Sequence, residues 1–94
     1  MYAAIRRYEG VTDSAEAGRL VNEAFVPLMR QIPGFVAYYW VDAGNGVMIS
    51  TSVFEDETGA KESVSTAEDF VQDKLAALMP NAPQVMAGDV VAFA

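Results

Sequence analysis

The chain contains no cysteine and no histidine. Without cysteine it can form no disulfide, thiolate nucleophile or zinc ribbon. Without histidine it lacks the usual haem and zinc ligand and the commonest general base. These two absences exclude most metal-dependent and nucleophilic chemistry, and we expect neither a metal site nor a bound cofactor.

Basic residues are also few, with 6 Lys and Arg against 13 Asp and Glu, for a net charge of −7. This balance argues against nucleic acid and against an anionic membrane surface as partners, because both need clustered cations. No apolar run reaches the ~18 residues of a membrane span. The N-terminus lacks the organisation of a signal peptide. We therefore expect an acidic cytoplasmic protein.

Apolar residues, by contrast, are plentiful. The 94 residues, 52% of them hydrophobic, predict a single domain over 1–94. A domain of this size buries only roughly 60–70% of its unfolded surface, so the excess apolar surface needs another cover. A second copy of the chain is the simplest one, and we expect a homodimer.

Local patterns predict the element order β-α-β-β-α-β. Asp13 and Glu16 form a capping box, and an apolar i, i+4 stripe follows. Asn45-Gly46 is a strong hairpin signal between two apolar strands. The expected elements are a strand over 2–8, a helix from Asp13 to Ile32, strands over 35–41 and 47–54, a helical region over 57–79 and a strand over 84–93.

Two interruptions are expected inside the helices, and one in the last strand. Pro27 removes one N–H group and should kink the first helix. The sequence Ser65-Thr66-Ala67-Glu68 looks like a new N-cap and should divide the second helical region. Gly88-Asp89 should interrupt the strand over 84–93.

This order is the split βαβ arrangement, so the predicted fold class is α+β and ferredoxin-like. Both helices then cover one face of a four-stranded antiparallel sheet. The strand over 35–41 carries no charge on either face. A strand with one solvent-exposed face should instead alternate apolar and polar residues. We therefore expect the second face to pack on a partner's sheet, which makes a dimeric α+β barrel.

Two short segments resemble landmarks of the antibiotic biosynthesis monooxygenase (ABM) superfamily. They are Ile32-Pro33-Gly34-Phe35 leading to Tyr38, and Ser52-Val53-Phe54-Glu55-Asp56. In that family the first helix typically ends in Pro-Gly before a strand with a recurrent Tyr, and the third strand ends in an aromatic residue followed by acidic ones. The resemblance spans the whole chain and implies a dimeric α+β barrel.

The resemblance also bears on activity. Some members of the superfamily oxidise polycyclic phenols with O₂ and no cofactor, and others degrade haem, isomerise sugars or have no assigned role. The haem-degrading branch uses a His ligand, an Asn on the first strand and a Trp ending the third strand. This chain has no His, carries Arg6-Arg7 on the first strand and has Phe54 at the aromatic position, so haem is not expected as a partner.

Alternation along the strands assigns the central residues to two faces. With an even-length turn at Asn45-Gly46, the helix-facing set is Tyr39, Ser50, Ser52 and Phe54. The opposite set, expected in the dimer or barrel core, is Tyr38, Trp40, Ile49, Thr51 and Val53. A loop of odd length would reverse the assignment.

Two functional hypotheses follow. In the first, the chain acts on a flat aromatic or quinone-like small molecule between sheet and helices. Arg6 and Arg7 point to opposite faces, and either could stabilise an anionic substrate. The predicted catalytic residues are Arg7 and Ser52, and the predicted substrate-binding residues are Arg6, Tyr39, Ser50 and Phe54.

The second hypothesis is a non-catalytic dimeric module for ligand binding or structure, in which the aromatic residues only build the core. The two hypotheses differ in the space between sheet and helices. A cavity of roughly 300 Å³ or more with converging polar groups favours the first. Solid packing by Phe25, Phe54 and Phe70 favours the second.

Overall fold

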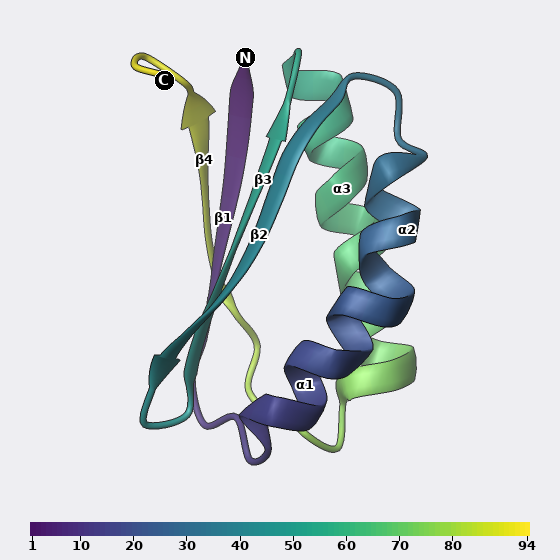
Figure 1. Cartoon of the computed structure of the whole chain (residues 1–94), viewed down its shortest axis with the longest axis vertical. Coiled ribbons are helices and arrows are strands. Elements are labelled where there is room, and N and C mark those ends of the chain that lie inside the picture. The colour runs from purple at the N-terminus through teal and green to yellow at the C-terminus, as the bar shows by residue number, and fades with distance from the viewer.

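The computed structural model describes all 94 residues (Figure 1). Its elements are β1 (Tyr2–Tyr8), α1 (Ser14–Leu20), the π-helical turn η1 (Val21–Phe25), α2 (Val26–Arg30), β2 (Phe35–Gly44), β3 (Val47–Phe54), α3 (Glu57–Phe70), the π-helical turn η2 (Val71–Leu75) and β4 (Gln84–Asp89). The sheet is antiparallel with strand order β2-β3-β1-β4. All helices cover one face of it, which confirms the α+β ferredoxin-like fold (Figure 1). None of the helices has the length and apolar character that a membrane span requires.

Both long helical regions begin at an aspartate cap. The Asp13 carboxylate accepts the N–H of Glu16 at 3.1 Å, as the capping box predicts, and the Asp56 carboxylate accepts that of Gly59 at 3.1 Å. The break predicted at Ser65 is wrong, because α3 continues without interruption to Phe70. Its buried residues recur every three or four positions on one face, so packing on the sheet holds the helix together there.

Each helical region instead contains one π turn. In η1 the N–H of Val26 donates to the carbonyl of Val21, five residues earlier. This wider turn lies immediately before Pro27, which has no N–H of its own to donate. The irregularity expected at Pro27 is therefore a π turn that precedes it.

The last strand is shorter than predicted. It ends at Asp89, with Gly88 and Asp89 inside it, and only the N–H of Val90 continues toward β1, donating to the carbonyl of Met1 at 2.9 Å. Val91, which the sequence assigned to the strand, has 94% of its surface exposed.

The β2–β3 hairpin contains a bulge that the sequence does not reveal. Asn45 and Gly46 form the two-residue turn, both with positive φ (54° and 76°), and Gly44 pairs with Val47. The pairing then skips Ala43. A bulge adds one residue to one strand, so the residues of β2 from Asp42 back to Ala37 change face, until a second register shift at Val36 restores the phase at Phe35.

The predicted faces of three aromatic residues are therefore wrong. Tyr38 and Trp40 point toward the helices, in register with Ser52 and Ser50. Tyr39 points to the uncovered face and has 62% of its surface exposed. The sequence placed Tyr39 in the helix-facing site and Tyr38 and Trp40 in a barrel core on the opposite face.

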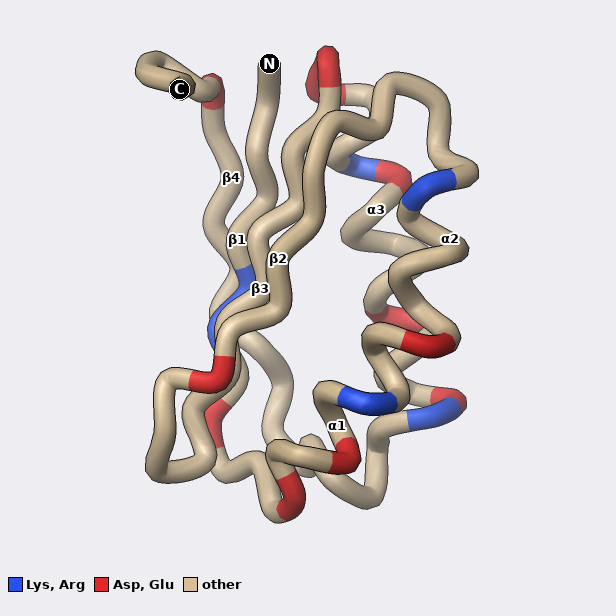
Figure 2. Tube along the Cα trace, viewed as in Figure 1, with Lys and Arg blue, Asp and Glu red and all other residues tan.

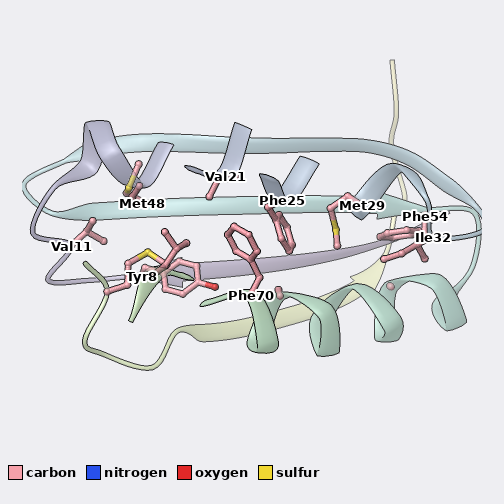
Figure 3. Packing of buried hydrophobic residues seen from close by; sticks show 14 residues of the cluster. Tyr8, Val11, Val21, Phe25, Met29, Ile32, Met48, Phe54 and Phe70 are labelled. Atoms are coloured by element: carbon pink, nitrogen blue, oxygen red, sulfur yellow. The ribbon is translucent and has the colours of Figure 1, made fainter. Parts of the chain in front are cut away.

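The hydrophobic core is one layer between sheet and helices (Figure 3). We call its two ends the Phe54 end and the Trp40 end. In Figure 3, Ile32 and Met29 lie toward the Phe54 end, and Tyr8 and Met48 lie toward the other. Phe25 and Phe70 occupy the middle, with ring centroids 5.0 Å apart.

Candidate functional site

A small cavity lies between sheet and helices toward the Trp40 end. Its volume is about 10 Å³, which is room for one water molecule. It is lined by Tyr8, Val21, Phe25, Tyr38, Trp40, Ser50, Ala67, Phe70, Val71 and Leu75. The two π turns supply Val21 and Phe25 from one side and Val71 and Leu75 from the other. Such turns are frequent at functional sites.

A larger opening, the Trp40 groove, lies between the α1–η1 helix and β2. It has a volume of about 360 Å³ and is lined by Ser14, Ala15, Gly18, Val21, Asn22, Val26, Tyr38, Trp40, Asp42 and Met48. It shares Val21, Tyr38 and Trp40 with the inner cavity, so only side chains separate the two spaces. Gly18 keeps the helix side open, since a Cβ there would stand 4.0 Å from the Trp40 ring.

Trp40 carries an unsatisfied polar group. Its indole Nε1 is buried and has no hydrogen-bond partner in the protein. A buried donor without an acceptor costs about 1–3 kcal/mol. Trp40 borders both the inner cavity and the Trp40 groove. Its Nε1 is not itself exposed to either space, so an acceptor from a bound molecule would reach it only after a side-chain movement.

Tyr38 lies beside Trp40 in both spaces. Burial raises the pKa of its phenol well above the usual value, and the hydrogen bond with Ser50 and the charge of Arg6 act in the opposite direction without cancelling this. The phenol is neutral near pH 7, as that of any tyrosine is, and burial keeps it neutral to higher pH. It can donate a hydrogen bond to a ligand but cannot act as a base.

The structure decides which of the two adjacent arginines faces the helices. Arg6 does, with 3% of its surface exposed, and its Nε donates to the Tyr8 hydroxyl at 2.9 Å. Arg7 points to the uncovered face and pairs with Glu9. Arg7 and Ser52, the two predicted catalytic residues, therefore lie on opposite faces of the sheet and are not brought together within one chain.

The other predicted site residues are only partly brought together. Ser50 lines the inner cavity, but Ser52 and Phe54 are buried in the core and line neither the cavity nor the Trp40 groove. Tyr39 lies on the far side of the sheet. The predicted substrate-binding roles of Phe54 and Tyr39 are therefore not supported by their positions.

Of the residues that line the Trp40 groove, the sequence pointed only to Tyr38 and Trp40, and the others, Gly18, Asn22 and Asp42 among them, were missed. Gly18 and Asn22 lie one helical turn apart on the α1–η1 helix, and Asp42 reaches the helix-facing side only because of the bulge at Ala43. The spacing of Gly18, Val21 and Asn22 on one helical face is a signal that could have indicated a gap there.

No family model matches the sequence, and none of the curated proteins matches it. Solved structures do match. A protein of unknown function from Nitrosomonas europaea has a TM-score of 0.78 at 21% identity, over 99% of this chain and 91% of that one. SnoaB, a cofactor-independent oxygenase from Streptomyces nogalater, has a TM-score of 0.75 at 13% identity, over 98% and 94%.

A further similar structure is a monooxygenase from the gene ActVA-Orf6 of Streptomyces coelicolor, in complex with the ligand nanaomycin D. Its TM-score is 0.71 at 14% identity, over 98% of this chain and 92% of that one. These likenesses show a shared fold along nearly the whole chain. The fold is that of the antibiotic biosynthesis monooxygenases, as the resemblance in the sequence predicted.

Proposed function

We propose that the protein binds a flat aromatic or quinone-like molecule in the Trp40 groove and oxidises it with O₂ without a cofactor. The observation that carries this proposal is the buried indole N–H of Trp40, which has no acceptor and belongs to a residue that lines a groove of about 360 Å³. That volume lies in the usual range for small-molecule sites, which are largely apolar with a few polar groups. A carbonyl or phenol oxygen of the ligand would supply the missing acceptor once a side-chain movement uncovers the N–H.

The Trp40 groove contains one residue that could remove a proton from the substrate and another that could stabilise the resulting anion. Asp42 is the one carboxylate that lines it and could remove a proton from a phenolic substrate. Tyr38, whose phenol is neutral near pH 7, could donate a hydrogen bond to the resulting anion. In the reaction, one atom of O₂ replaces the two hydrogens of a ring CH₂ as a carbonyl. The other atom leaves with those hydrogens as water.

A second candidate is a dimeric binding module without catalysis. The observation in its favour is the size of the inner cavity, about 10 Å³, which Phe25 and Phe70 close. Tyr8 and Ser50 line a space that is too small for a substrate. If this packing persists when a ligand binds, the ligand can occupy only the Trp40 groove.

The uncovered sheet face supports the proposal of a homodimer. Tyr39, Val41 and Met86 are exposed there, on the face opposite the helices. Single exposed apolar residues are common, but several on one sheet face indicate an interface. We expect the double variant Tyr39→Lys, Val41→Lys to sediment as a monomer and the unaltered chain as a dimer. A monomeric unaltered chain at micromolar concentration would contradict this.

The groove can be tested through Trp40, the only tryptophan of the chain. A dihydroxyanthraquinone should quench its fluorescence with saturation. Gly18→Leu fills the space over the Trp40 ring and should weaken binding at least ~10-fold, which is about 1.4 kcal/mol. Ala24→Leu is the matched control, because Ala24 is exposed on the same helix outside the groove. Equal affinities for both variants would contradict this site.

Oxygen consumption separates the two candidate functions. With a dihydroxyanthrone as substrate, the enzyme should consume one O₂ for each quinone formed, and Asp42→Asn should slow turnover more than it weakens binding. Binding by the unaltered chain without oxygen uptake above the uncatalysed rate would indicate a binding module.

A further inference from the structure

Arg6 is the buried cation of the sheet–helix layer. Arg6 and Arg7 are the only basic residues of the sheet, and Figure 2 shows them together on β1. Arg7 is paired with Glu9, but no carboxylate lies within 4.0 Å of the Arg6 guanidinium. Arg6 nevertheless has only 3% of its surface exposed. Burying a charge without a counter-charge is costly.

The donors of Arg6 are only partly used. Its Nε donates to the Tyr8 hydroxyl at 2.9 Å and its Nη1 to the Val64 carbonyl at 3.4 Å. A guanidinium has five N–H donors, so three of them have no partner in the protein. Both acceptors are neutral. The guanidinium carbon also lies over the Tyr8 ring, 5.8 Å from its centroid, but no carboxylate pairs with the charge of Arg6.

A second groove, the Arg6 groove, opens at this guanidinium. It has a volume of about 250 Å³ and is lined by Arg6, Glu68, Val71, Gln72, Ala76, Met79, Pro80, Asn81, Ala82 and Pro83. It lies between the α3–η2 helix and the segment before β4, and it shares no residue with the Trp40 groove. It is thus a separate site, beyond the proposed function.

We propose that the Arg6 groove binds a small organic carboxylate. The planar fork of N–H groups on Arg6 matches the two oxygens of a carboxylate. Val71, Met79 and Pro80 form an apolar wall beside it that suits a short hydrocarbon or aromatic body, and the Gln72 amide adds a polar group. A bound carboxylate compensates the buried charge that the protein leaves unpaired.

Glu68 is the competing partner, because it is the one acidic residue that lines this groove. Its carboxylate lies more than 4.0 Å from Arg6 and forms no ion pair with it. In the proposed site Glu68 repels an anionic ligand. If Glu68 were instead the internal counter-ion of Arg6, removing its charge would destabilise the protein. The variant Glu68→Gln therefore distinguishes the two roles.

The test is a ¹H–¹⁵N NMR titration of the full chain at constant ionic strength, with sodium benzoate as probe and neutral benzamide as its matched control. Benzoate should shift the amides of residues 68–72 and 79–83 with a Kd on the order of millimolar, as expected for so small a ligand. Benzamide should bind at least ~10-fold more weakly. Inorganic phosphate, an anion without an apolar body, should also bind more weakly than benzoate.

Three variants complete the test. Glu68→Gln should tighten benzoate binding about 2–5-fold, Arg6→Lys should weaken it about 3–10-fold, and Arg6→Gln should abolish it. Equal binding of benzoate and benzamide, or of benzoate and phosphate, would overturn the proposal. So would a lower Tm for Glu68→Gln with no tighter binding. These outcomes decide the question even if Arg6→Gln fails to fold.

Discussion

The two ends of the sheet–helix layer are built differently. At the Phe54 end, ring contacts fill the space. Phe54 is fully buried, its ring lies 5.9 Å from that of Phe35, and a Cβ on Gly59 would stand 2.8 Å from it. At the Trp40 end the layer holds an unpaired indole N–H, a buried cation and two grooves.

This difference indicates that the Phe54 end stabilises the fold and that the Trp40 end binds ligands. Interiors packed to native density contribute most to stability. Unsatisfied buried groups reduce stability and are retained at sites where a ligand satisfies them. We therefore expect substitutions at the Phe54 end to change the free energy of unfolding and those at the Trp40 end to change binding.

The largest expected effect is that of Phe54→Ala. Removing this fully buried ring should lower the free energy of unfolding by about 3–5 kcal/mol, measured by urea denaturation. Quenching of Trp40 by the anthraquinone should keep the same Kd in the folded fraction. Val91→Ala is the control, since Val91 is exposed and its replacement should cost nothing measurable. A binding defect with intact stability would place Phe54 in the site after all.

One substitution, glycine to alanine in a helix, should have opposite signs at the two ends. At Gly59 the new Cβ would stand 2.8 Å from the Phe54 ring and 3.0 Å from the Pro33 carbonyl oxygen, so we expect a loss of about 1–3 kcal/mol. At Gly18 the contact with Trp40 is an ordinary 4.0 Å, and alanine should stabilise the helix by about 0.5–1 kcal/mol. Thermal unfolding of both variants measures the difference. If both substitutions change the stability in the same direction, the two ends are packed alike and the account is contradicted.

The smallest expected effect concerns Tyr38 and pH. Burial raises the pKa of its phenol in the folded state above the value of about 10 in the unfolded chain. The buried neutral phenol of Tyr38 therefore makes its full contribution to the free energy of unfolding below about pH 10. This contribution is lost as the pH rises above about 10, because the unfolded chain then ionises first. Tyr38→Phe should therefore lose less stability than the unaltered chain between about pH 10 and 12. Tyr39→Phe on the uncovered face is the control, and an identical effect of both variants would contradict this cause.

Local chemistry made most of the fold predictable. The capping box at Asp13, the Pro33-Gly34 helix end and the Asn45-Gly46 turn act over a few residues, and each lies where the sequence placed it. The predicted break at Ser65 failed because tertiary packing of α3 on the sheet outweighs a local cap signal.

The site was less predictable, because it depends on strand register. A single extra residue at Ala43 reverses the faces of Tyr38, Tyr39 and Trp40. The local signal for this bulge is Gly44, whose positive φ (85°) suits a bulge beside the turn, but Asn45-Gly46 alone predicts a hairpin without one. The same alternation correctly put Arg6 and Arg7 on opposite faces, but only the pairing of Arg6 with Ser50 shows which one faces the helices.

The most direct test of the division between the two ends is the indole N–H resonance of Trp40 in a ¹H–¹⁵N spectrum. A chain with one tryptophan gives one such signal. On addition of the dihydroxyanthraquinone, this resonance should shift with the same Kd as the fluorescence quenching, and the shift should be lost in Gly18→Leu. An indole resonance that stays in place while amides around Phe54 move would contradict the account.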